Sequence, residues 1–212
     1  MTIDDVIQKR EIRELLHFTT LKGLLGILGS RKLLSREFLK QEDLLEYIAN
    51  PNTPFVMDEG WEGYVNISIS EINFRLFDIS INKWDAGKQN KWVILGISPE
   101  ILNHEGVFFA TTNNGYSGVS RGQGVEGLEA LFSPTVQIYD TGKSETRLQN
   151  HNSWNPTCPQ AEVLYYKELP TSHITHIYVL EDEDREDITG YFEFTSHPKI
   201  ELITAPKKFE GF

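Results

Sequence analysis

Two short polar pairs stand near opposite ends of the 212-residue chain, and their side chains are of types that take part in group-transfer chemistry. The first pair is His17 and Thr19, and the second is Gln160 and Glu162. Residues two apart in a β-strand lie on the same face of the sheet, so each pair would project to one side. Together the pairs could line one cleft that holds a polar cofactor and sets one carboxylate against its reactive carbon.

Each pair needs a strand to position it, and the apolar residues around each pair predict one. We expect a strand over 16–20, followed by a helix over 21–28 that is capped by Thr20. A second strand is expected over 162–166, where β-branched and aromatic residues follow Glu162. The polar stretch 141–159 shows no periodicity, and a loop of that length is typically functional or disordered.

The remaining patterns predict short strands mixed with short helices, which is typical of an α+β fold. Expected helices are 3–15, 36–48 and 125–132, with a helical turn or further strand at 72–77; expected strands are 64–70, 91–98, 107–110, 175–180 and 201–203. Loops are expected at 50–54 and, as a mobile segment, at 113–124, and the acidic run 181–187 predicts a solvated turn. No repeat or domain boundary is visible, so residues 1–212 are expected to form a single domain.

Composition places the chain among ordinary globular proteins, at 39% hydrophobic and 24% charged residues. No run approaches the roughly 18 apolar residues of a membrane span. The charged N-terminal segment lacks the apolar core of a secretory signal, and the single Cys158 suits a reducing cytoplasm. A net charge of −11 argues against a broad electrostatic grip on nucleic acid, although it leaves room for a local basic channel. No histidine or cysteine spacing indicates a metal site.

Several segments, taken in order, resemble the DarT family of ADP-ribosyltransferase toxins, which use NAD⁺ to modify nucleic-acid bases. The resemblance runs from about residue 14 to about residue 180. It rests on His17-Phe18-Thr19 followed by Leu24-Leu25-Gly26-Ile27-Leu28 and Lys32-Leu33-Leu34-Ser35; on Val65-Asn66-Ile67-Ser68-Ile69-Ser70 with Asn73; on Lys91-Trp92-Val93-Ile94-Leu95 with Pro99-Glu100-Ile101-Leu102 and Thr111-Thr112-Asn113; and on Pro159-Gln160-Ala161-Glu162-Val163-Leu164.

The resemblance implies an ADP-ribosyltransferase-like fold, with a central split mixed or antiparallel β-sheet and short flanking helices. It implies NAD⁺ as co-substrate without a metal, and a nucleobase as acceptor, with single-stranded DNA favoured. Residues 64–113 resemble the branch that modifies guanine more than the branch that modifies thymine. A toxin also implies a cognate antitoxin, either an inhibitor or a hydrolase that removes ADP-ribose.

For the catalytic residues, the resemblance points to Glu162 and Gln160. Cleavage of the bond between nicotinamide and ribose passes through an oxocarbenium-like transition state, which a carboxylate such as Glu162 can stabilise. The Gln160 amide both donates and accepts hydrogen bonds, which suits the edge of an acceptor base.

Binding roles follow for a further set of residues. His17 and Thr19 are expected to hold NAD⁺, and Asn73, Thr112 and Asn113 to contact its ribose or nicotinamide, although a turn or capping role suits these last three equally. The family's NAD⁺-contacting arginine is assigned to Arg75, with Arg31 and Arg36 as alternatives. Basic and aromatic residues on the two polar loops are expected to bind the acceptor strand, namely Arg121, Arg147 and Trp154.

Other functions stay open at this point. RNA is an alternative acceptor, as in an mRNA-directed ADP-ribosyltransferase of a toxin–antitoxin phage-defence system, because nothing in the sequence selects a deoxyribose. The chain could also be a catalytically inactive module that binds NAD⁺ or nucleic acid, or a transferase that modifies proteins.

Overall fold

The computed structural model describes residues 1–39, 59–84 and 90–210. Its helices are α1 (Ile3–Arg10), α2 (Leu21–Ser30), α3 (Arg36–Leu39), α4 (Phe74–Ile79), α5 (Gly124–Ala130) and α6 (Glu183–Thr195), with short helices η2 (Ser80–Trp84), η3 (Pro99–Asn103), η4 (Thr171–His173) and η5 (Pro206–Phe209). Its strands are β1 (Leu15–Thr20), β2 (Lys32–Leu34), β3 (Tyr64–Ile69), β4 (Trp92–Ile97), β5 (Phe108–Ala110), β6 (Arg121–Gly122), β7 (Thr135–Gln137), β8 (Ser144–Thr146), β9 (Glu162–Tyr166), β10 (Glu168–Pro170), β11 (Ile174–Val179) and β12 (Glu201–Thr204). The expected loop 50–54, and the expected helix 36–48 beyond Leu39, lie outside these residues.

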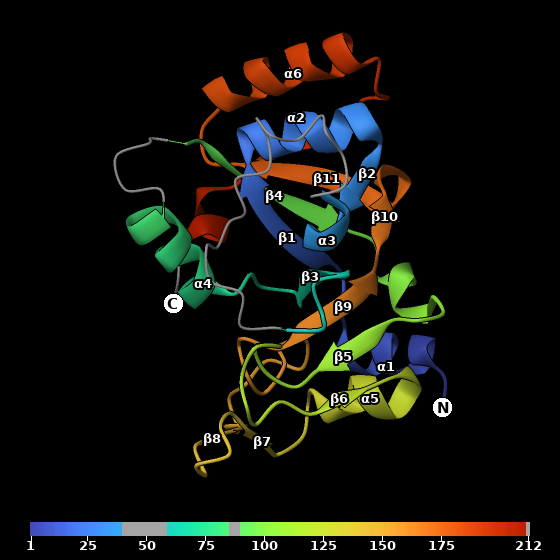
Figure 1. Cartoon of the computed structure of the whole chain (residues 1–212), viewed down its shortest axis with the longest axis vertical. Helices are drawn as coiled ribbons and strands as arrows, with labels where there is room; N and C mark the ends of the chain where they lie inside the picture. The colour runs from blue at the N-terminus through green and yellow to red at the C-terminus, as the bar shows by residue number, and fades with distance from the viewer. Residues whose placement is uncertain (40–58, 85–89, 211–212) are drawn as a thin grey trace.

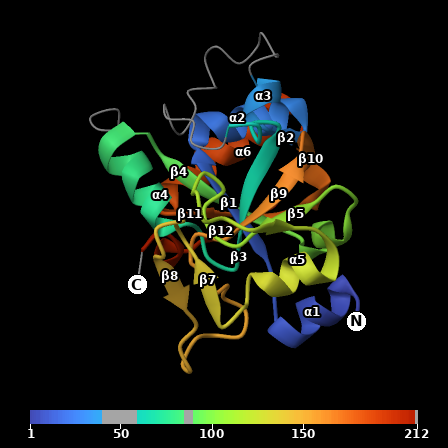
Figure 2. The same cartoon turned by 60° about the horizontal axis from the view of Figure 1, so that its bottom comes forward.

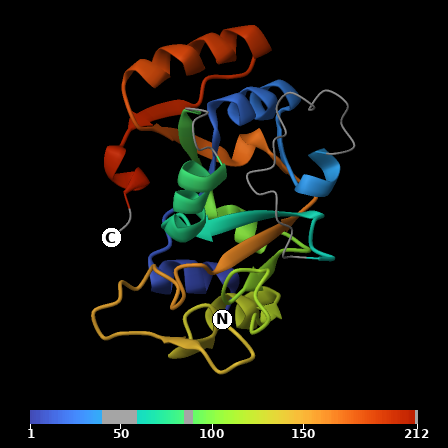
Figure 3. The ribbon, with the colours of Figure 1, turned by 60° about the vertical axis from the view of Figure 1, so that its left-hand side comes forward.

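A mixed, mostly antiparallel sheet runs through the molecule (Figure 1). Within the described residues, eight strands follow the order β12-β11-β4-β1-β3-β9-β5-β6, and β11 with β12 is the parallel pair. Helix α2 covers the β1–β4 region with α6 stacked outside it, as the blue and red helices of Figure 3 show. Helices α1 and α5 pack together near β5 and β6 (Figure 2).

The sheet splits between β1 and β3. Strand β1 pairs with β4 along its whole length, from Leu15 opposite Ile97 to Thr20 opposite Trp92. With β3 it pairs only at Leu15 and Leu16, after which the two strands separate. His17 is therefore the first residue of β1 beyond the shared ladder, where backbone groups of β3 are left for side chains to bond.

Alternation along β1 assigns its side chains to two apolar clusters. Leu15 belongs to the larger cluster, which includes the buried face of α2. Leu16 and Phe18 face the opposite way and pack in a second cluster with Phe77 of α4. Both faces of β1 are therefore covered, which fixes its register and the position of the polar pair His17 and Thr19.

The solvated turn predicted over the acidic run is wrong, because most of that run is the first turn of α6. Negative side chains stabilise the positive end of a helix dipole, and Lys91 pairs with Asp184 and Asp187 at 2.9 Å each. The buried residues of α6 are Asp184, Ile188 and Phe192, a stripe at spacing four. None of the helices in the described parts of the chain is both long and apolar enough to span a bilayer.

Candidate active site

Glu162 is the first residue of β9, and its side chain is only 3% exposed. Its Oε2 accepts a hydrogen bond from Asn66 Nδ2 at 3.1 Å and another from the backbone N–H of Asn114 at 2.8 Å. A buried carboxylate is costly unless donors compensate it, and two donors on one oxygen also fix its orientation. The sheet thus holds an oriented, buried carboxylate at the position predicted to be catalytic.

His17 lies in the split of the sheet, with its Nδ1 2.9 Å from the backbone oxygen of Asn66. A carbonyl oxygen only accepts, so Nδ1 carries the proton in this contact. Burial lowers the pKa of His17, which favours the neutral ring and leaves Nε2 as a hydrogen-bond acceptor. Asn66 therefore links the two polar pairs, since its backbone bonds His17 and its side chain bonds Glu162.

Thr19 is buried against the first turn of α2. A Cβ atom at Gly23 would lie 2.4 Å from Thr19 Oγ1, so this approach requires glycine. The predicted cap at Thr20 is confirmed, because its Oγ1 accepts from Gly23 N–H at 3.0 Å. Thr19 and the N-terminus of α2 are thus set against each other.

Gln160 is half-buried, and its Oε1 accepts a hydrogen bond from the Tyr116 hydroxyl at 2.9 Å. Burial raises the pKa of the Tyr116 phenol, while the positive charge of Arg75 opposes that rise. Arg75 is exposed on α4. Among the arginines considered for NAD⁺, Arg75 affects the pKa of Tyr116, the hydrogen-bond partner of Gln160, whereas Arg31 donates to the backbone oxygen of Ser196 at the end of α6.

The segment 113–124, predicted to be a mobile loop, is instead tied down next to Glu162. Arg121 donates to Asn114 twice, from Nε to Oδ1 and from Nη2 to the backbone oxygen, both at 2.6 Å. The guanidinium also lies 4.7 Å from the ring centroid of Trp61. Arg121, predicted to contact the acceptor, therefore fixes the residue whose N–H bonds the Glu162 carboxylate.

A second arginine organises the loop before β9 in a similar way. Arg147 donates to the backbone oxygen of Asn155 at 2.7 Å and to that of Asn152 at 2.6 Å. The backbone oxygen of Trp154, in the same stretch, accepts from Ser70 Oγ at 3.2 Å just after β3. The loop that carries the other two predicted acceptor contacts is thus held by its own arginine and by the end of β3.

The weaker NAD⁺ candidates Asn73, Thr112 and Asn113 differ in how many of their polar atoms already form hydrogen bonds within the protein. Asn73 caps α4 through Oδ1, at 3.1 Å from Leu76 N, while its buried Nδ2 has no hydrogen-bond partner among the described residues. Thr112 is fully buried, with its hydroxyl 3.2 Å from Cys158 Sγ. Asn113 Oδ1 accepts from Gly115 N–H at 3.0 Å in a turn. Asn73 keeps a donor for a ligand, whereas the structure gives Thr112 a packing role and Asn113 a turn role.

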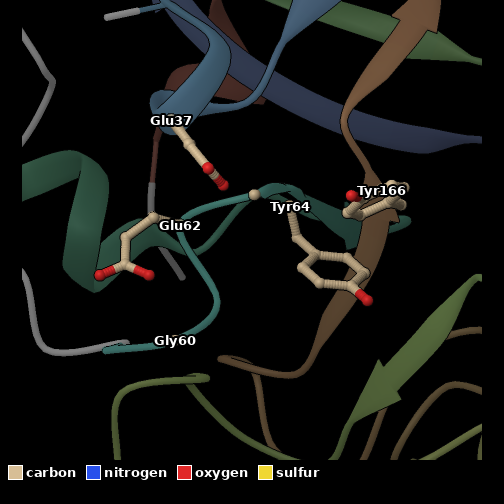
Figure 4. A pocket seen from close by; sticks show the side chains of 6 residues that line it. Glu37, Gly60, Glu62, Tyr64 and Tyr166 are labelled. Carbon is tan, nitrogen blue, oxygen red and sulfur yellow. The ribbon is translucent and has the colours of Figure 1, made fainter.

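A hollow of about 440 Å³ opens at the far end of the strand pair that carries Asn66 and Glu162 (Figure 4). Tyr64 and Tyr166 line it side by side, with ring centroids 5.3 Å apart, opposite each other on β3 and β9. The remaining lining residues are Glu37, Gly60, Glu62 and Gly63. Because side chains alternate along a strand, both tyrosines project to the face that carries Asn66 and Glu162.

Two residues of the site, Asn66 and Asn114, were given no role from the sequence, whereas Tyr116 lies on a loop expected to bind the acceptor strand. Asn66 carried a signal, because it is a polar residue between Val65 and Ile67 in a strand. Asn114 contacts Glu162 through its backbone N–H, which every residue except proline possesses, so its residue type does not predict this contact. None of the described residues forms a cluster of histidine, cysteine or carboxylate side chains that could hold a metal ion.

Comparison with known proteins identifies the family of this chain. The family model described as "ssDNA thymidine ADP-ribosyltransferase, DarT" matches residues 16–210. The chain belongs to the DarT family. It is an NAD-dependent ADP-ribosyltransferase, with NAD⁺ as its co-substrate, of a family that modifies single-stranded DNA.

Solved DarT structures share the fold. Thermus sp. 2.9 DarT in complex with NAD⁺ is similar with a TM-score of 0.65 and 14% identity, over 94% of this chain and 98% of that one. The same protein in complex with ADP-ribosylated ssDNA has a TM-score of 0.60 and 16% sequence identity, over 94% of this chain and 97% of that one. Thermosipho africanus DarTG in complex with ADP-ribose has a TM-score of 0.62 and 14% sequence identity, over 93% of this chain and 51% of that one. The predicted α+β fold with a split sheet is confirmed, and no curated protein sequence gives a significant match.

Proposed function

We propose that this chain transfers ADP-ribose from NAD⁺ to a base of single-stranded DNA and acts as the toxin of a toxin–antitoxin pair. The observation that carries the chemistry is the buried Glu162 carboxylate, oriented by Asn66 and Asn114 next to the split that holds His17. The acceptor class follows from family membership and from the Thermus DarT that was captured with ADP-ribosylated ssDNA.

In the proposed reaction, the bond between the ribose anomeric carbon and the nicotinamide nitrogen breaks, and nicotinamide leaves as a neutral molecule with the electron pair. Positive charge develops on the ribose, where the Glu162 carboxylate stabilises it. A nitrogen of the base then bonds to the anomeric carbon and loses its proton to solvent. His17 Nε2 accepts from a ribose hydroxyl, while Thr19, Asn73 Nδ2 and the exposed Arg75 provide further NAD⁺ contacts.

The acceptor base must leave a base stack before its edge can be reached, which favours a single strand. The family description names thymidine, whereas residues 64–113 resemble the guanine branch. We therefore propose a thymine or a guanine as the target. Arg147 and Trp154 serve the acceptor strand by shaping the loop before β9.

Three broader features complete the proposal. A cognate antitoxin, either an inhibitor or an ADP-ribose hydrolase, is supported by the family and by the likeness to a DarTG chain. Residues 1–212 are proposed to form one ADP-ribosyltransferase domain, since a continuous sheet draws strands from Leu15 to Thr204. A cytoplasmic location stays a prediction from the sequence.

Intact-mass analysis of oligonucleotides after incubation with NAD⁺ tests the proposal. The same sequence is offered as single-stranded DNA, duplex DNA and RNA, with Glu162→Gln protein as the control. The expected product is single-stranded DNA heavier by one ADP-ribose, absent with the variant. Modification of RNA alone would favour the mRNA-directed alternative. A protein that gains the mass of ADP-ribose would favour protein modification, and no product with any acceptor would favour an inactive binding module.

A further inference from the structure

A residue outside the Gln-x-Glu motif fixes which way the Gln160 amide faces. The Tyr116 hydroxyl donates to Gln160 Oε1 at 2.9 Å. Because the amide carries its oxygen and its nitrogen on opposite sides, occupying the oxygen directs the Nε2 hydrogens away from Tyr116. What Gln160 offers to a ligand in this arrangement is a pair of donors.

Tyr116 is itself held firmly enough to impose that orientation. Its backbone N–H donates to Asn113 oxygen at 3.0 Å, and its ring packs 4.8 Å from that of Tyr139. A Cβ atom at Gly118 would lie 2.7 Å from the Ile138 carbonyl carbon. The loop that carries Tyr116 therefore packs so closely against the backbone at Ile138 that only glycine fits there. Burial raises the pKa of Tyr116, which keeps the phenol protonated and able to donate.

The same loop acts on both residues of the Gln-x-Glu pair. Asn114 donates its backbone N–H to Glu162, and two residues later Tyr116 donates its hydroxyl to Gln160. Arg121, which holds Asn114 by two hydrogen bonds, anchors the loop at its far end. The loop therefore sets the carboxylate and the amide in one rigid arrangement.

We propose that Tyr116 is a specificity-determining residue. It makes Gln160 a hydrogen-bond donor, so that the enzyme selects bases with a carbonyl oxygen at pyrimidine position 4 or purine position 6 over bases with an amino group at that position. Thymine O4 and guanine O6 accept hydrogen bonds, whereas cytosine and adenine present amino donors at the corresponding positions. The enzyme would accordingly take thymine and guanine as a class. This inference rests on the proposed transfer to a DNA base.

The wild-type protein tests the selection directly with altered bases. Single-stranded oligonucleotides of alternating cytosine and adenine receive one central thymine, guanine, hypoxanthine or 2-aminopurine, and the added ADP-ribose is followed by intact mass. Hypoxanthine keeps the O6 of guanine and 2-aminopurine lacks it. We expect at least one carbonyl-bearing base to react at least about tenfold faster than 2-aminopurine and the background, since an unpaired donor is costly.

Variants then assign the selection to Tyr116. Tyr116→Phe frees the amide to rotate, so the preference for carbonyl bases should fall about threefold to tenfold, the effect of one hydrogen bond. Gln160→Glu replaces the donor pair with an acceptor and should shift the preference toward amino bases. Tyr165→Phe is the matched control, because it removes a phenol that bonds His104 at 2.9 Å instead, and it should keep the wild-type ratio.

The ratio between oligonucleotides is independent of the total activity of each variant, so partial loss of activity does not mask it. Equal modification of all bases by wild type, or an unchanged ratio in both Tyr116→Phe and Gln160→Glu, would overturn the inference while leaving base modification intact. If no oligonucleotide gains mass, the proposed function itself fails, which is a separate result.

Discussion

Two glutamates adjoin the central sheet, and each is surrounded by hydrogen-bond donors of a different kind. Glu14 lies just before β1, and its carboxylate accepts from Lys208, from His176 Nε2 at 3.0 Å and from the Tyr178 hydroxyl at 2.7 Å. Glu162 begins β9, and its Oε2 accepts from the amides of Asn66 and Asn114. The donors to Glu14 include a fully charged ammonium group, whereas the amides of Asn66 and Asn114 carry no net charge.

The difference shows how one sheet can use carboxylates for two purposes. Burial opposes ionisation of Glu14, but hydrogen bonds from His176, Lys208 and Tyr178 outweigh it and lower the pKa of Glu14 to about 2. This ion pair fastens η5 to the start of β1. The amides of Asn66 and Asn114 orient Glu162, and we propose that this orientation lets the carboxylate stabilise positive charge as it develops on a ribose.

The largest effect among the supporting residues is expected from Asn66→Asp. This change replaces an amide donor with a second carboxylate next to Glu162, and like charges raise the pKa of a neighbouring carboxyl group. The single-turnover rate of transfer at pH 7 should fall about 100-fold, against about tenfold for Asn66→Ala, which only removes the donor.

Rates measured from pH 5 to 9 distinguish the two variants. The acid limb of the Asn66→Asp profile should move further toward high pH than that of Asn66→Ala, because a second negative charge is added as well as a donor lost. Superimposable profiles for the two variants would show that Asn66 only supports the strand.

Glu14→Gln should lower the stability of the protein and leave the transfer rate close to wild type, unlike the Asn66 variants, which lower the transfer rate. Because the pKa of Glu14 in the folded protein lies below its ordinary value of 4.5, this group contributes stability above pH 4.5 that is lost as the pH falls toward 2. A pKa lowered from 4.5 to about 2 corresponds to about 3 kcal/mol at pH 7. Urea unfolding of wild type and variant at pH 3 and pH 7 measures the loss, and equal stability of the two proteins at pH 7 would contradict an ion-pair role.

The smallest effects should come from the two arginines that hold loops. Arg121→Ala loosens Asn114 and through it Glu162, so transfer to DNA and hydrolysis of NAD⁺ without DNA should both fall about tenfold. Arg147→Ala loosens only the loop before β9, so transfer should fall about threefold while NAD⁺ hydrolysis is kept. Parallel losses in both reactions for Arg147→Ala would place that loop in the NAD⁺ site rather than the acceptor site.

Local patterns predicted the elements nearest the chemistry well. The strand over 162–166 is confirmed at both ends, and Thr20 caps α2 as expected, because strand alternation and helix caps depend on a few neighbouring residues. Helix α6 was missed because its first turn is acidic and its apolar stripe is short, so that packing on α2 decides its structure.

Long-range contacts account for the parts of the site that the sequence did not reveal. Asn114 meets Glu162 across 48 positions in the chain, and Asn66 meets it across 96. Arg121 and Arg147 have the residue type that binds phosphate, but the fold brings backbone oxygens to their guanidinium groups first. The tertiary structure decides which oxygen atoms an arginine side chain bonds, and the neighbouring sequence does not predict them.

The most direct test of the different purposes of Glu162 and Glu14 measures single-turnover transfer to single-stranded DNA and NAD⁺ affinity in three proteins: wild type, Glu162→Gln and Glu14→Gln. Glu162→Gln should lower the rate about 1000-fold with NAD⁺ affinity within about threefold of wild type, because the charge acts in the transition state. Glu14→Gln should transfer at close to the wild-type rate. A Glu162→Gln protein that modifies DNA at the wild-type rate would contradict the assignment of Glu162 as the catalytic carboxylate.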